Sequence, residues 1–204
     1  MYFEKCDEPE TVDKWNKKAK PCGSYERRSS YADEFIRRSG IAPDDTVFDM
    51  GCGTGTLCLP LADDGHTVFC GDYSDQMLKF LRETIEAEGL SQITLQKMSF
   101  LDDWTQYDIP VCDMVFASRS LINVDPAVVL PKLSAYARKR VCITIHVDSE
   151  DGELSGFSYK AQENRDYLKA CLNAVIDMGY LPRLDYMDCM FDGRKGWAFI
   201  WWDV

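Results

Sequence analysis

The chain has 204 residues, of which 46% are hydrophobic, and its formal net charge at pH 7 is −11. This length suits one domain with a sizeable core, and no stretch reaches the roughly 20 consecutive apolar residues of a membrane-spanning helix. We therefore expect no membrane association. The negative charge repels a phosphate backbone, so nucleic acid is disfavoured as a partner.

Nine cysteines are spread along the chain, and none of them forms a Cys-x-x-Cys pair. Cys70, Cys112 and Cys142 lie in or beside apolar segments that we expect to be buried strands, where cysteine behaves as a small hydrophobic residue. Residues 1–8 lack the charged-then-apolar layout of a secretory signal. We therefore expect a reduced, cytoplasmic protein. A zinc site is not expected, because neither histidine has metal-ligand spacing to a cysteine pair.

The first 40 residues are polar and carry a basic group of side chains around Trp15 and Tyr25. The group consists of Lys14, Lys17, Lys18, Lys20, Arg27 and Arg28. Basic and aromatic residues together can mark a nucleic-acid surface. We favour a solvated amphipathic segment that folds over the functional site. We thus predict a single domain, residues 1–204, with an N-terminal helical cap (1–40) and a core (41–204).

From residue 46 onward, apolar strand-like segments alternate with helix-like segments. Strands are predicted at 46–50, 66–70, 93–98, 113–117, 141–147, 183–190 and 197–202, and helices at 31–39, 56–63, 75–88, 126–138 and 160–178. Such alternation implies an α/β fold with a doubly wound, mainly parallel seven-stranded sheet and helices on both faces. Residues 191–196 are too few for a crossover helix, so the last two strands should pair antiparallel.

The first predicted strand runs into a glycine-rich turn, Asp49-Met50-Gly51-Cys52-Gly53-Thr54-Gly55. Glycine lets the backbone pass close under a ligand, since no Cβ blocks the approach. A dinucleotide-binding loop places a glycine three positions after Gly53, where Thr56 stands here. The Asp-x-Gly-x-Gly-x-Gly pattern instead resembles motif I of the class I S-adenosylmethionine (SAM) dependent methyltransferases. The resemblance implies that the turn faces the methionine part of SAM, with Asp49 near its amino group.

The second predicted strand ends in Asp72, 17 residues beyond Gly55. An ionised carboxylate there can accept hydrogen bonds from both hydroxyls of a ribose. The alternative is a solvated turn acid. Because NAD and SAM both carry an adenosine ribose, only the glycine pattern separates these two cofactors. Ser74 is predicted to be the N-cap of the following helix.

The resemblance also implies that the loop after the third strand packs on the adenine of SAM. Asp102 or Asp103 would accept a hydrogen bond from its amino group, although both acids could simply cap the turn. The residues assigned to cofactor binding are Asp49, Gly51, Cys52, Gly53, Gly55, Leu57, Asp72, Tyr73, Met77, Ser99, Phe100, Leu101 and Ser118.

Two residues near the ends of strands four and five are candidates for catalysis. Arg119 could bind a substrate carboxylate in fork geometry, or pair with Asp49 or Asp72 as a structural bridge. His146 could act as a general base or be a structural strand-end residue. A catalytic metal is not expected, because Asp113 stands at the wrong end of strand four.

The resemblance implies a transferase that uses SAM, releases S-adenosylhomocysteine (SAH) and methylates an O, N or other nucleophilic atom. The Asn/Asp-Pro-Pro-aromatic motif of amino-methylating families is missing after strand four, which disfavours methylation of adenine, cytosine or glutamine amino groups. With no inserted substrate domain, a small-molecule acceptor is favoured. The alternatives are a protein methyltransferase, a non-catalytic SAM-binding module that recruits a partner, and an NAD-linked oxidoreductase. The sequence does not predict the acceptor or the oligomeric state.

Overall fold

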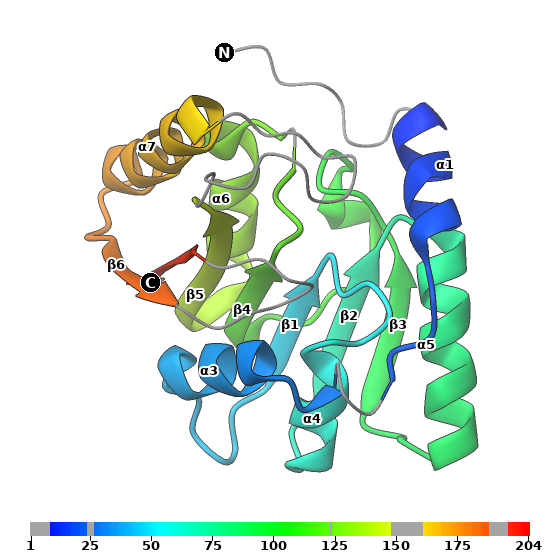
Figure 1. Ribbon diagram of the computed structural model, residues 1–204. Coiled ribbons are helices and arrows are strands. Elements are labelled where there is room, and N and C mark those ends of the chain that lie inside the picture. The colour runs from blue at the N-terminus through cyan, green and yellow to red at the C-terminus, as the bar shows by residue number, and fades with distance from the viewer. Residues whose placement is uncertain (1–8, 24–26, 123, 148–160, 188–195) are drawn as a thin grey trace.

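The computed structural model describes residues 9–23, 27–122, 124–147, 161–187 and 196–204 (Figure 1). Its centre is one seven-stranded sheet with the strand order β3-β2-β1-β4-β5-β7-β6. The strands are β1 Val47–Met50, β2 Val68–Asp72, β3 Ile93–Lys97, β4 Cys112–Ser118, β5 Ala137–His146, β6 Arg183–Met187 and β7 Trp197–Asp203. The first five pair in parallel, while β7 runs antiparallel to both of its neighbours. This arrangement confirms the predicted fold class.

Helices cover both faces of the sheet. They are α1 Pro9–Lys18, α3 Ser30–Ser39, α4 Cys58–Asp63, α5 Asp75–Glu88, α6 Pro126–Ala135 and α7 Ala161–Asp177, with a short 3-10 helix η1 at Trp104–Gln106. One core cluster contains the buried side chains of α6 and α7, and the other contains those of α3, α4 and α5. No helix in the described ranges is both long and apolar enough to cross a membrane.

Local sequence signals explain several element boundaries. Ser74 caps α5, because its hydroxyl accepts a hydrogen bond from the backbone N–H of Met77 at 3.2 Å, as predicted. The helix predicted at 126–138 ends at Ala135, and β5 begins at Ala137 instead of residue 141. The early start follows from pairing, since Ala137 lies opposite Cys112 and Arg140 lies opposite both Met114 and Asp203.

The cysteines of the strands are interior residues. Cys70, Cys112 and Cys142 are buried, and burial is the main factor that raises the pKa of each thiol. All seven cysteines within the described ranges carry free thiols. The expectation that strand cysteines serve as small hydrophobic residues is therefore confirmed.

The N-terminal region is bound to the core through ion pairs. Arg27 bridges Asp63 at the end of α4 and Glu88 at the end of α5, the latter at 2.6 Å. Arg28 pairs with Asp64 at 2.7 Å. These two members of the basic group are thus neutralised within the chain, which weakens the case for a nucleic-acid surface. Tyr25 lies outside the described residues.

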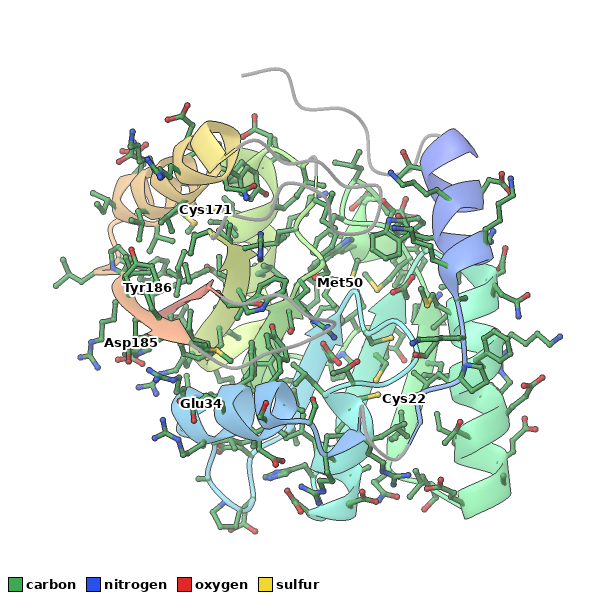
Figure 2. All side chains as sticks on the ribbon, viewed as in Figure 1. Cys22, Glu34, Met50, Cys171, Asp185 and Tyr186 are labelled. Carbon is green, nitrogen blue, oxygen red and sulfur yellow. The ribbon has the colours of Figure 1, made fainter. Side chains whose placement is uncertain are left out.

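Helix α3 is also tied to the opposite edge of the sheet. Arg38 contacts Glu34 at 2.6 Å and forms an ion pair with Asp185 of β6. Figure 2 shows the labelled Glu34 and Asp185 on the same side of the molecule. On its inner face, α3 buries Tyr31 and Phe35 completely. This helix is therefore part of the folded core and its position is fixed from both sides.

Candidate functional site

The strand order reverses between β1 and β4, the place where open α/β sheets bind ligands at the carboxyl ends of their strands. In Figure 1 the arrowheads of β1, β2 and β4 point to the same edge of the sheet. The glycine turn follows β1 at this edge. Its residues Gly51, Gly53 and Gly55 all have positive φ, at 79°, 56° and 108°.

The glycine turn packs closely against the loop that follows β4. A Cβ on Gly51 would overlap the Ser120 Cβ and would lie 2.7 Å from the Ser120 Oγ. That hydroxyl donates to the carbonyl of Met50, labelled in Figure 2, at 2.9 Å. The backbone N–H groups of Gly51 and Cys52 both donate to the Gly71 carbonyl. The turn therefore requires glycine at residue 51.

Gly53 is the open part of the turn. The nearest atom to a Cβ built on it is the Met77 sulfur, at 3.9 Å. Its backbone N–H donates to Asp72 Oδ2 at 2.9 Å. The turn thus leaves open space where a Gly53 side chain would stand, while Asp72 holds the Gly53 backbone.

Asp72 joins the glycine turn to helix α5. Its Oδ2 accepts from Gly53 N–H, and its Oδ1 accepts from Ser74 N–H at 2.8 Å. The side chain is 7% exposed, so it is not a solvated turn acid. Burial raises the pKa of this carboxyl, while the backbone hydrogen bonds lower it. A carboxylate has about four acceptor positions, so each oxygen can still accept a hydrogen bond from a ligand hydroxyl.

Helix α1 reaches the start of α5 from the N-terminal region. The side-chain oxygen of Asn16 accepts hydrogen bonds from Ser74 Oγ at 2.7 Å and from Gln76 N–H at 3.2 Å. In Figure 1 the helix lies beside α5. Asn16 was missed in the sequence, because a single asparagine in a polar segment carries no signal of a contact 58 residues away.

Asp49 is a second buried carboxyl at the end of β1. Burial is the main cause that raises its pKa from 3.8 to about 7, with a further increase from the charge of Asp72. The charge of Arg119 acts in the opposite direction. Two buried carboxyls beside an open glycine turn fit a ligand that carries vicinal hydroxyls and a positive charge.

We expect the stability of the ligand-free protein to record the titration of Asp49. Between about pH 4 and pH 7 the unfolded chain has lost a proton that the folded chain keeps, so the free energy of unfolding falls as pH rises. Above pH 7 the penalty is constant, at about 4 kcal/mol. Relative to wild type, Asp49→Asn should therefore gain up to about 4 kcal/mol of stability from pH 4 to pH 8.

Chemical denaturation of both proteins at several pH values measures this difference. Asp75→Asn is the matched control, because Asp75 is exposed at the first turn of α5 and pairs with Lys97. The control should show no comparable gain. A difference between Asp49→Asn and wild type that does not change with pH would contradict the expected titration.

The loop after β3 is more deeply packed than the sequence indicates. Phe100 is 1% exposed and belongs to the core, with its ring centroid 6.4 Å from that of Trp104. Asp102 accepts hydrogen bonds from Ser99 N–H and Tyr107 O–H, both at 2.7 Å. Asp103 caps η1 through Thr105 N–H. Both acids thus cap the turn, which was one of the two readings that the sequence left open.

The thirteen residues assigned to the cofactor fall into two groups by burial. The half-buried ones, whose surface a ligand can reach, are Gly51, Gly53, Tyr73, Met77, Leu101 and Ser118. The buried ones are Asp49, Cys52, Gly55, Leu57, Asp72, Ser99 and Phe100. The thirteen residues lie at the carboxyl ends of β1, β2, β3 and β4 or in the segments that follow β1, β2 and β3, so they gather at one edge of the sheet.

Arg119 lies directly after β4 and reaches the glycine turn. Its Nη2 donates to Thr56 Oγ1 at 3.0 Å, and its guanidinium carbon is 4.6 Å from the centroid of the Tyr31 ring. The Tyr31 hydroxyl is 2.7 Å from Ser118 Oγ and 2.6 Å from Thr144 Oγ1. Tyr31 lies in the predicted N-terminal cap of residues 1–40, and the sequence gave no signal for Thr144.

His146 ends β5 and is half-buried. Its ring is 5.0 Å from the ring of Trp197 in an edge-to-face arrangement. Trp197 is 4% exposed, and its indole N–H has no hydrogen-bond acceptor among the described residues. The sequence missed Trp197 as a neighbour of His146, because only the β5–β7 register brings the two together.

Within the described residues, no three histidine, cysteine or acidic side chains are arranged to hold a metal ion. Asp113 lies at the amino end of β4, opposite the edge that carries the glycine turn. The neighbouring guanidinium of Arg138 holds the pKa of this carboxyl below its ordinary value.

The sequence of the core has recognisable relatives. Residues 47–141 match the family described as a methyltransferase domain. An uncharacterized protein from Haemophilus influenzae is 38% identical over 133 residues, which make up 64% of this chain and 49% of that protein. The human EEF1A lysine methyltransferase 2 is 36% identical over 73 residues, 35% of this chain and 31% of that protein. The chain spans about half or less of the length of the curated relatives that it matches.

The whole fold is also similar to solved structures. A precorrin-6y C5,15-methyltransferase from Geobacter metallireducens superposes with a TM-score of 0.65 at 13% sequence identity. The superposition covers 92% of this chain and 96% of that one. At this identity the similarity concerns the fold.

Proposed function

Because the chain belongs to the class I SAM-dependent methyltransferases, we propose that it transfers the methyl group of SAM to a nucleophilic atom of a small-molecule acceptor. The product of the cofactor would be SAH. The observation that carries the proposal is the pair formed by Gly53 and Asp72. A buried carboxylate holds an open glycine turn and keeps acceptor positions for hydroxyl groups.

The residues present fit this cofactor. Asp72 would accept hydrogen bonds from the ribose hydroxyls, and Asp49 would face the ammonium group of the methionine part. The turn from Gly51 to Gly55 would run beneath that part, since the space above Gly53 is open. Leu101 and Met77 are half-buried apolar side chains that would contact the adenosine.

When bound, SAM supplies an activated methyl group on a sulfonium, so the protein needs little covalent chemistry of its own. The work of the chain is to exclude water and to hold an acceptor atom in line with the methyl group. Orientation of this kind contributes roughly 7–11 kcal/mol to lowering a barrier. His146 is the candidate to remove a proton from an acceptor hydroxyl or amine.

A small acceptor is supported by the limited cover at this edge of the sheet. Helix α3 contributes Tyr31, β5 contributes His146, and β7 contributes Trp197, whose buried N–H is a donor available to an acceptor oxygen. The precorrin methyltransferase of similar fold carries a small-molecule acceptor in its name. The human lysine methyltransferase supports the alternative, a protein acceptor, through a match to about a third of this chain.

We propose that residues 1–204 form one domain, with residues 1–40 as a cap over the site. Asn16 of α1 and Tyr31 of α3 support this, because both contact the rim of the cofactor site. We also propose a cytoplasmic location, which the free thiols of the seven described cysteines support.

The test begins with isothermal titration of the protein with SAM, SAH and NADH. Binding of the two sulfur ligands alone is expected, and binding of NADH alone would refute the proposal. Transfer of a labelled methyl group from SAM to the low-molecular-weight fraction of a cell extract is the expected second result. Label only in the protein fraction would favour a protein methyltransferase. SAM binding without transfer to either fraction would favour a non-catalytic module.

A further inference from the structure

Arg119 has an unusual backbone. Its φ is 56°, and within the described part of the chain it is the one residue other than glycine with a positive φ. This conformation is strained for an L-residue with a long side chain, and such strain concentrates at ligand-binding sites. Glycine, which would remove the strain, would also remove the side chain.

Buried contacts over-determine this conformation. The backbone N–H of Arg119 donates to Thr144 Oγ1 at 3.1 Å, and that hydroxyl is 2.6 Å from the Tyr31 O–H. The Tyr31 hydroxyl also contacts Ser118 Oγ at 2.7 Å. The ring of Tyr31 lies under the guanidinium, whose carbon is 4.6 Å from the ring centroid. The Tyr31 side chain of α3 thus contacts Ser118, Thr144 and the guanidinium of Arg119.

The guanidinium is aimed at the amino-acid side of the cofactor site. Nη2 donates to Thr56 Oγ1, one residue after the last glycine of the turn. Arg119 is also close enough to Asp49 for its charge to lower the pKa of that carboxyl. A fixed cation and a buried carboxyl on the same turn match the two charges of an α-amino acid, a carboxylate and an ammonium group.

We infer that Arg119 binds the carboxylate of the methionine part of SAM, and that Tyr31 is the positioning residue that holds it there. The inference rests on the proposed function. It moves Arg119 from catalysis to cofactor binding and makes the helical cap a determinant of cofactor affinity. A carboxylate on the acceptor is the rival ligand for the same guanidinium.

A comparison of two ligands measures how much the carboxylate contributes to binding. SAH carries it, while the decarboxylated analogue of SAH keeps the adenosine and the ammonium group but lacks it. Wild type and Arg119→Gln are titrated with both ligands. The affinity for SAH should fall by roughly 10–100-fold in the variant, and the affinity for the analogue by less than about threefold. In wild type the analogue should itself bind more weakly than SAH.

Tyr31→Phe keeps the ring and removes only the hydroxyl. We expect this variant to bind SAH roughly 3–10-fold more weakly and to bind the analogue with unchanged affinity. The hydrogen bonds of the Tyr31 hydroxyl are lost, while the stacking of its ring on the Arg119 guanidinium remains. Tyr136→Phe is the matched control, because its hydroxyl also bonds a buried segment, the Trp104 carbonyl at 3.2 Å, away from the turn. The control should bind both ligands as wild type does.

Equal weakening of both ligands in Arg119→Gln would show a general effect on the fold and overturn the inference. Unchanged SAH affinity in that variant would also overturn it and would leave an acceptor carboxylate as the rival ligand. Failure of the proposed function itself looks different, because wild type would then bind neither ligand.

Discussion

Replacing Asp72 with alanine is expected to weaken the binding of SAH by about 100-fold or more. Two contributions are lost together. The ribose hydroxyls lose a charged acceptor, at roughly 1.5–3 kcal/mol for each hydrogen bond. The backbone N–H groups of Gly53 and Ser74 also lose their common partner, so the turn and the start of α5 are no longer held to each other.

Isothermal titration measures the loss, and Asp75→Ala is its control. Asp75 is also an acid at the start of α5, but it is exposed and pairs with Lys97 at 2.7 Å. Exposed ion pairs contribute little, so the control should bind SAH within about twofold of wild type. Wild-type affinity in Asp72→Ala would remove the main support for the proposed cofactor site.

Replacing Gly51 with alanine is expected to destabilise the protein by about 3 kcal/mol or more and to abolish measurable SAH binding. The positive φ of 79° strains any residue with a Cβ, at roughly 1–2 kcal/mol. Overlap with Ser120 adds roughly 1–3 kcal/mol, because the turn and the loop after β4 would have to separate.

Chemical denaturation separates the two contributions to that loss. Gly65→Ala introduces backbone strain without steric overlap, since Gly65 has φ 94° and no atom lies within 4 Å of a Cβ built on it. It should lose about 1–2 kcal/mol. Adding Ser120→Gly to Gly51→Ala removes the overlap and should recover part of the difference. Equal losses in Gly51→Ala and Gly65→Ala would mean that the two loops do not pack as described.

The parts of the site that are local in sequence were predictable. Glycine spacing, an acid at a strand end and a serine N-cap are set by backbone conformation over a few residues, so Asp72 and Ser74 stand where their pattern indicates. The parallel pairing of the first five strands follows from the alternation of strands and helices along the chain.

The parts that join distant segments were not predictable. The contact between Tyr31 and Thr144 spans 113 residues, and the one between Asn16 and Ser74 spans 58. Neither a tyrosine nor an asparagine in a sequence indicates which distant residue it will contact. Phe100 is a further example, because its place in a loop gave no sign that its side chain packs in the core.

The position of β7 has a consequence for synthesis. This strand fills the place between β5 and β6, so those two cannot be joined until residues 197–203 have left the ribosome. A nascent chain halted before this point would expose the edge of β5, whose residues 141–145 are apolar apart from Thr144. Unpaired apolar edges promote aggregation. Pairing of β7 with β5 is therefore the folding step that covers an aggregation-prone edge.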